Sequence, residues 1–158
     1  MAGFSEKEQA LVKSSWEDIT KNFSHHSIRF YTLLLEILPA AKEMFPFLKD
    51  SNDVPKNNPQ LEAQAMKVFK LTLESATQLR EKGEAAMEDA ALKQLSSVHV
   101  QKGVTDSHFE ALKEALLKTI KEAAGAKWNE ELNDAWARAY DELAANIKKG
   151  MAKAWCLS

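Results

Sequence analysis

An apolar stripe with helical spacing in the last third of the chain limits its fold more than any other feature. Its members recur every three or four residues from Leu132 to Ile147, so on a helix they share one face. Earlier stretches show the same spacing, whereas no run alternates with the period of a strand. The sequence therefore predicts an all-α protein of about six or seven helices with unequal lengths.

Local signals predict where single helices begin and end. Capping residues, a proline and acidic first turns mark starts, and glycines mark ends. The predicted starts are Ser5 with Glu8, Pro39, Ser107 with Glu110, and Asn129. The predicted ends are Gly125 and Gly150, with residues 151–158 as a C-terminal tail. Residues 49–60, which are rich in Asn, Asp and Pro, are expected to form a loop.

The composition excludes several classes of protein. A chain of 158 residues suits one domain, residues 1–158, with its own core. A net charge of −2 offers no basic field for nucleic acid or a membrane surface. The single cysteine, Cys156, permits no internal disulfide. The polar N-terminus resembles no signal peptide and no apolar run is long enough to span a membrane, so a cytoplasmic protein is expected.

One histidine faces inward in residues 92–104, here called the His99 segment. Leu92, Leu95 and His99 are spaced i, i+3 and i+7, so on a helix they share an apolar face with Ser96 nearby. A buried imidazole needs partners for its ring nitrogens. It is either a core histidine bonded to a backbone carbonyl or an axial ligand to a haem iron.

A second face is compatible with the haem interpretation. In the helix predicted from Leu61, the residues Gln64, Lys67, Val68 and Leu71 share one side, and Phe45 before the loop offers an aromatic wall. An ordinary helix rim explains the same pattern. The motifs of phosphate loops, zinc proteases, di-iron bundles and serine hydrolases are absent from the sequence.

Several stretches resemble plant haemoglobins, and within that group the leghaemoglobins of nitrogen-fixing root nodules. They are FSEKEQALVKSSWE, RFYTLLLEILPAAKEMFPFLKDS, NNPQLEAQAMKVFKL, LSSVHVQKGVTDSHF and ALLKTIKEAAGAKWNEELNDAWARAYDELAANIKKG. They cover nearly the whole length, and the last two are long and specific. The resemblance implies the all-α globin fold, with about six to eight helices wrapped around haem b (iron protoporphyrin IX).

The resemblance also implies roles for single residues. His99 matches the proximal histidine that binds iron, and Tyr31 matches a tyrosine that some leghaemoglobins place above the iron. The second ring nitrogen of His99 is expected to donate to the Leu95 carbonyl or the Ser96 hydroxyl. The further expected haem contacts are Phe45, Lys67, Val68, Leu95, Ser96 and Val104. For Lys67, a solvated side chain is the alternative to a contact with a haem propionate.

Gln64 departs from the family pattern, because it occupies the position of the usual distal histidine. A histidine there can bind iron and close the sixth coordination site, whereas a carboxamide is a poor iron ligand. The sequence therefore predicts an open, five-coordinate ferrous haem, with Gln64 and Tyr31 as the two candidate hydrogen-bond donors to a ligand.

Three functions are compatible with these residues. The first is reversible binding of dioxygen for carriage, buffering or facilitated diffusion, with nitric oxide and carbon monoxide as further ligands. The second is a haem enzyme acting on nitric oxide, nitrite or peroxide, which would need an outside reductant because no flavin or nicotinamide module is recognised. The third is a haem-free helical protein of globin descent. The resemblance of the last helix to that of leghaemoglobins implies a monomer, with a homodimer, as in many non-symbiotic plant haemoglobins, as the alternative.

Overall fold

The computed structural model describes residues 5–44, 59–82, 93–94, 96–97, 99–100 and 104–157. These residues are helical or form turns, with no strand among them, so the all-α prediction is confirmed. The α-helices are α1 (Glu6–Thr20), α2 (Phe23–Ile37), α4 (Pro59–Lys82), α6 (Asp106–Ala124) and α7 (Glu130–Leu157). Two short 3₁₀ helices, η1 (Pro39–Met44) and η2 (Gly125–Lys127), complete the described elements. No helix in the described part is long and apolar enough to span a membrane.

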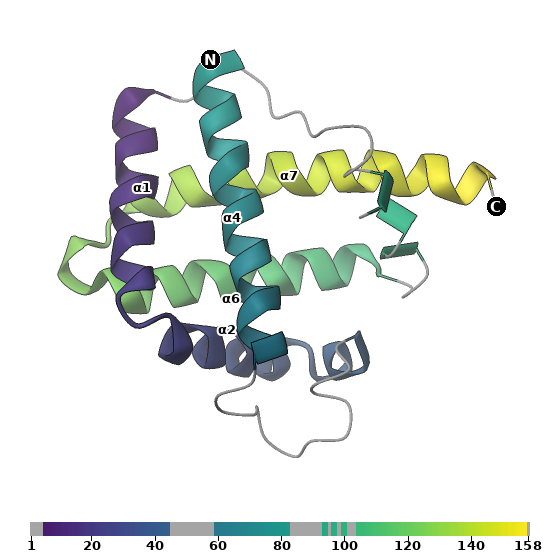
Figure 1. The fold of residues 1–158 in the computed structure, drawn as a ribbon, viewed down its shortest axis with the longest axis horizontal. Helices are drawn as coiled ribbons and strands as arrows, with labels where there is room; N and C mark the ends of the chain where they lie inside the picture. The colour runs from purple at the N-terminus through teal and green to yellow at the C-terminus, as the bar shows by residue number, and fades with distance from the viewer. Residues whose placement is uncertain are drawn as a thin grey trace.

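Two groups of helices cross each other: α1 and α4 run in one direction, and α2, α6 and α7 run across them (Figure 1). Helices α6 and α7 run antiparallel and are joined by η2, and α4 crosses them at a steep angle. The most extensive contacts join α2 to α6 and α4 to α7. Such crossed packing leaves a core between helices that are distant in sequence.

The first helices begin where the local signals predict. Ser5 accepts a hydrogen bond from the Glu8 N–H at 3.0 Å, and the Glu8 carboxylate accepts from the Ser5 N–H at 3.1 Å. This reciprocal pair satisfies two N–H groups that the start of α1 would otherwise leave unpaired. Pro39 opens η1 as predicted, since a proline needs no N–H partner at a first helical position.

The turn between α6 and α7 also follows its sequence signals. Gly125 ends α6 with a φ of +55°, a left-handed backbone that glycine adopts without a steric penalty. The Asn129 side chain then accepts from the Leu132 N–H at 2.8 Å and caps the start of α7.

Two predicted helix boundaries are wrong. Gly150 does not end α7, which continues to Leu157, because a glycine inside a helix costs only about 1 kcal/mol relative to alanine. Gly150 is buried and extends the apolar stripe that contains Ile147. The start of α6 is Asp106, with Thr105 as the capping residue in place of Ser107. The His108 ring accepts there from the Thr105 N–H at 2.9 Å, the task that was expected of a glutamate.

Aromatic side chains from four helices meet around Phe69 in the core. Its ring lies 5.8 Å from that of Trp16, 5.6 Å from that of Phe30 and 6.1 Å from that of Trp136. Rings at these spacings bury large apolar areas and add favourable edge contacts. Phe69 therefore fixes α4 against α1, α2 and α7 at once.

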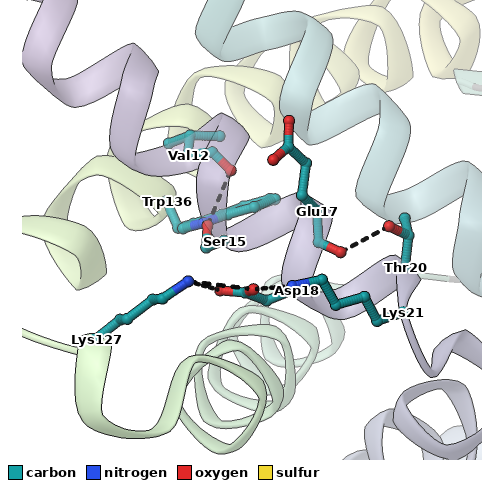
Figure 2. A network of polar contacts seen from close by, with 8 residues as sticks. All are labelled: Val12, Ser15, Glu17, Asp18, Thr20, Lys21, Lys127 and Trp136. Atoms are coloured by element: carbon teal, nitrogen blue, oxygen red, sulfur yellow. Dashed lines mark hydrogen bonds and ion pairs between the residues drawn. The ribbon is translucent and has the colours of Figure 1, made fainter.

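A hydrogen-bonded chain closes the core between α1 and α7 (Figure 2). The buried indole of Trp136 donates to the Ser15 hydroxyl at 2.7 Å, and that hydroxyl donates to the Val12 carbonyl at 2.9 Å. Both side chains are buried, so each bond replaces a lost bond to water. We call this arrangement the Trp136 corner.

Asp18 ties the same corner to the α6–α7 turn (Figure 2). Its carboxylate lies 3.3 Å from the ammonium groups of both Lys21 and Lys127, and its side chain is only 14% exposed. Burial alone would raise the pKa of Asp18, but the hydrogen bonds from Lys127 and Lys21 outweigh burial and lower it. The carboxylate therefore remains charged throughout the neutral range.

Candidate functional site

The described residues of the His99 segment are helical up to residue 100, as the periodicity predicts. The half-buried imidazole of His99 stacks on the ring of Phe109 in α6, with 5.8 Å between ring centroids and 12° between ring planes. The His99 carbonyl accepts from the Val104 N–H at 3.0 Å. The imidazole plane is therefore oriented by a second helix.

Ser96 attaches the same segment to α7. Its side chain is almost completely buried, and its hydroxyl donates to the Ile147 carbonyl at 3.4 Å. This bond directs the Ser96 proton toward α7. Leu95, whose carbonyl was the other expected acceptor for His99, lies outside the described residues.

Phe109, on which His99 stacks, is itself held by α7. Tyr140 is buried and donates its phenolic proton to the Phe109 carbonyl at 2.9 Å. Burial, with a smaller contribution from the charges of Glu110 and Asp141, raises the pKa of Tyr140 well above its ordinary value. The hydroxyl therefore keeps the proton that it donates.

Lys148 also lies against Phe109. Its ammonium nitrogen is 5.1 Å from the centroid of the Phe109 ring and 3.3 Å from the carboxylate of Asp106. An ammonium group within about 6 Å of an aromatic face is attracted by the electrons of the ring. The aromatic neighbour of His99 is thus also the neighbour of a positive charge.

Three predicted site residues lie together on α4. Gln64, Lys67 and Val68 are spaced i, i+3 and i+4, so one helix face carries all of them. Gln64 and Val68 are half-buried, Val68 packs against the core, and Lys67 is exposed. Gln64 therefore lies at the border between core and solvent.

Tyr31 on α2 is completely buried and packs edge-on against Phe30, with ring centroids 5.1 Å apart. Burial raises the pKa of its phenol far above the ordinary value. The hydroxyl, which is neutral at physiological pH even in an exposed tyrosine, therefore keeps its proton well into the alkaline range. Val104, another predicted contact, is half-buried against the core. Phe45 lies outside the described residues.

Two further histidines stand side by side at the start of α2. His25 is exposed, whereas His26 is half-buried, and its Nδ1 atom is buried with no hydrogen-bond partner among the described residues. Burial and the neighbouring His25 lower the pKa of His26, while Glu122 opposes that shift.

The imidazole of His99 is chemically compatible with a haem. Among the described residues, no group of three or more His, Cys, Asp or Glu side chains gathers to hold an ion. A lone imidazole suits a metal whose other ligands come from a macrocycle. The flat aromatic partner of His99 fixes the ring plane that such a ligand needs.

Phe109, Tyr140 and Lys148 had no predicted role at the site. In sequence, Phe109 and Tyr140 are ordinary members of apolar stripes, and Lys148 is one of many lysines. Phe109 is distinguished by its stack on His99, and Tyr140 and Lys148 by their contacts with Phe109. No spacing signal along the chain could have found them.

Comparison with known proteins defines the class. The model of the family described as Globin matches residues 28–147, and the chain belongs to that family. A globin of Drosophila melanogaster superposes with a TM-score of 0.67 over 92% of this chain and 94% of its own, at 22% identity, which supports the fold.

The relatives narrow the class to plant haemoglobins. A leghemoglobin of Canavalia lineata is 61% identical over 98% of this chain and 100% of its own. A protein of Gossypium hirsutum that is named as an anaerobic nitrite reductase is 57% identical over 94% of each chain. A leghemoglobin-1 of Lupinus luteus is 57% identical over 98% of this chain and 99% of its own. These relatives confirm the resemblance to plant haemoglobins and leghaemoglobins.

Proposed function

We propose that this chain holds haem b through His99 and binds dioxygen reversibly, for carriage, buffering or facilitated diffusion. The observation that carries the proposal is the His99 imidazole, oriented by its stack on Phe109 on a chain of the globin family. When bound, haem supplies a ferrous iron that can take a diatomic ligand. Nitric oxide and carbon monoxide are the other diatomic ligands expected.

On the proximal side, His99 would hold the haem iron through one ring nitrogen. The bonds of Ser96 to α7 and of the His99 carbonyl to Val104 limit movement of the segment that carries the ring. We assign the Leu95 carbonyl or the Ser96 hydroxyl as acceptor for the second nitrogen, which would fix the tautomer. Fixing that tautomer keeps a lone pair available for the metal.

On the distal side, Gln64 and Tyr31 are the proposed hydrogen-bond donors. A carboxamide donates a proton but binds iron poorly, so Gln64 would leave the ligand side of a bound haem open. The phenol of Tyr31 is the second proposed donor, since a tyrosine is protonated at neutral pH and burial raises its pKa further. A donor to a partly charged ligand is worth about 1–3 kcal/mol.

The remaining predicted contacts complete the pocket. We assign Phe45 to stacking on the porphyrin, Val68 to crowding the ligand side and Val104 to the proximal edge. Lys67 is exposed, so it could contact a haem propionate without the burial of its charged group. We further propose a single-domain, cytoplasmic monomer that binds neither nucleic acid nor membranes.

A haem enzyme is the second candidate, and the names of relatives favour it. The Gossypium hirsutum relative and one from Solanum lycopersicum, 56% identical over 94% of this chain, are both named as anaerobic nitrite reductases. In that alternative, the same open site would accept nitrite, nitric oxide or peroxide, with electrons from an outside reductant.

Ligand kinetics test the proposal. Removing the amide donor by Gln64→Leu should speed dioxygen release by about five- to a hundredfold, equivalent to a bond of about 1–3 kcal/mol. Tyr31→Phe provides the comparison for the second donor. Unchanged rates in both variants and in Gln64→His would contradict the distal assignments.

Turnover assays separate the two functions. The dioxygen-binding function predicts that purified protein with an excess of a mild chemical reductant consumes nitrite slowly relative to its dioxygen exchange. Sustained multiple turnover of nitrite or nitric oxide with a physiological type of reductase would instead make catalysis the main function.

A further inference from the structure

A positive charge, an aromatic ring and the proposed iron ligand form a continuous stack at the His99 end of the molecule. Lys148 lies over the Phe109 ring at 5.1 Å, and that ring lies almost parallel to the His99 imidazole at 5.8 Å. The members come from α7, α6 and the His99 segment. We call this arrangement the Lys148–Phe109–His99 stack.

Each member of the stack is held by an independent contact. Tyr140 fixes the backbone of Phe109, and the buried Phe109 ring has little freedom to rotate away. Asp106 directs the Lys148 ammonium group by an ion pair at 3.3 Å. Phe109 is therefore firmly held, and the Lys148 ammonium group is directed toward it by an ion pair at the surface.

The charge of Lys148 is not cancelled by its partner. Asp106 is 87% exposed and sits in the first turn of α6, where its carboxylate also favours the helix dipole. An exposed ion pair is strongly screened by water. The side chain of Lys148 is only 39% exposed, so part of its field acts through the protein on Phe109 and His99.

We propose that Lys148 is a positioning residue that acts through Phe109 on His99 and favours the ferrous over the ferric state of the bound haem. The inference rests on the proposed function, since it requires haem on His99. Ferric haem carries one more positive charge than ferrous haem, so a nearby cation disfavours oxidation. The Phe109 ring is the polarisable group that contacts both the ammonium group and the imidazole.

The reduction potential of the haem protein tests this inference. Lys148→Met keeps most of the apolar stem and removes the charge, so the ferrous-to-ferric ratio at a given potential should fall by about two- to fivefold. That corresponds to a decrease of about 20–40 mV for a one-electron couple. Lys148→Arg retains the cation and should restore the wild-type potential.

Lys149→Met is the matched control. Lys149 is the next residue on α7, is exposed, and changes the net charge of the protein equally when substituted. Its substitution should leave the potential within error of wild type. Equal decreases for Lys148→Met and Lys149→Met would overturn the inference, because the effect would then be one of net charge alone.

A double-mutant cycle tests whether the effect passes through the ring. In a Phe109→Leu background, with folding verified by circular dichroism, Lys148→Met should shift the potential much less than in wild type. An undiminished shift would overturn the role of Phe109. Purified protein without a Soret band, or an unaltered Soret band in His99→Ala, would instead refute the proposed function itself.

Discussion

The two ends of the α6–α7 pair differ in how far their polar side chains are buried and bonded within the protein. At the Trp136 corner, the indole, the Ser15 hydroxyl and the Asp18 carboxylate all bond within the protein. At the other end, the polar side chain of His99 is only half-buried. The first end consolidates the fold, whereas the second carries the histidine that we propose as the iron ligand.

From this difference we expect stability to depend mainly on the first end and haem binding mainly on the second. Substitutions at the Trp136 corner should change the free energy of unfolding without changing the spectrum of a bound haem. Substitutions at the His99 end should do the reverse. Four experiments, given from the largest expected effect to the smallest, test whether stability and haem binding depend on separate ends of the molecule.

Removal of the proposed iron ligand should have the largest effect. We expect His99→Gly to lose the Soret band on purification, because no other described histidine stacks in the same place. Added imidazole should restore the band by occupying the space of the lost ring. His25→Ala, at an exposed histidine, is the control and should retain the wild-type spectrum.

Alkaline titration should have the next largest effect. The chain has only two tyrosines, Tyr31 and Tyr140, and burial raises the pKa of both above the ordinary value of 10.0. The unfolded chain therefore loses these protons at lower pH than the folded protein, and stability falls as pH rises above about 10. The loss is about 1.4 kcal/mol for each tyrosine by about pH 11.

Tyrosinate absorbance in the near ultraviolet measures that titration. In the folded apoprotein it should stay low at about pH 10.5 and rise only as the chain unfolds, whereas urea-denatured protein should titrate near about pH 10. If half of the tyrosine were ionised in folded protein at about pH 10, these phenols would be more accessible to solvent than their burial indicates.

Ser15→Ala should have a moderate effect confined to stability. It leaves the buried indole N–H of Trp136 without its acceptor, which costs about 1–3 kcal/mol in urea unfolding. Ser14→Ala, at the exposed neighbouring position, is the matched control. A changed Soret maximum in Ser15→Ala would show that the Trp136 corner also affects the haem, which would contradict the expected separation.

The ion pairs of Asp18 should have the smallest effect. Asp18→Asn should cost about 0.5–1 kcal/mol near neutral pH, because the lysine partners are exposed and screened. The pKa of Asp18 is lowered in the folded state, so its contribution is present above the unfolded value of 3.8 and is lost as pH falls below it. The difference from wild type should therefore disappear near about pH 2, and Glu17→Gln should show no comparable loss.

Signals that act within one turn of helix were predictable from the sequence. The capping pair Ser5 and Glu8, the start at Pro39, the stop at Gly125 and the cap at Asn129 all appear where expected. Each depends on backbone groups a few residues away, so the local sequence contains the needed information.

Boundaries and contacts set by tertiary packing were not predictable. Gly150 continues α7 because its position is buried against the rest of the molecule, which outweighs a weak local preference. His99 and Lys148 both contact Phe109 only after three segments pack together. An inward-facing histidine could be predicted from its stripe and from the family resemblance, whereas the side chains around it come from other helices and leave no signal in the local sequence.

The absorption spectrum of the deoxygenated ferrous protein tests the central claim most directly. Haem held by His99 opposite Gln64 should give a five-coordinate, high-spin spectrum with one broad visible band, which changes fully and reversibly on adding dioxygen. A six-coordinate, low-spin ferrous spectrum would contradict the open site. Absence of any Soret band after reconstitution with haem would contradict the assignment of His99.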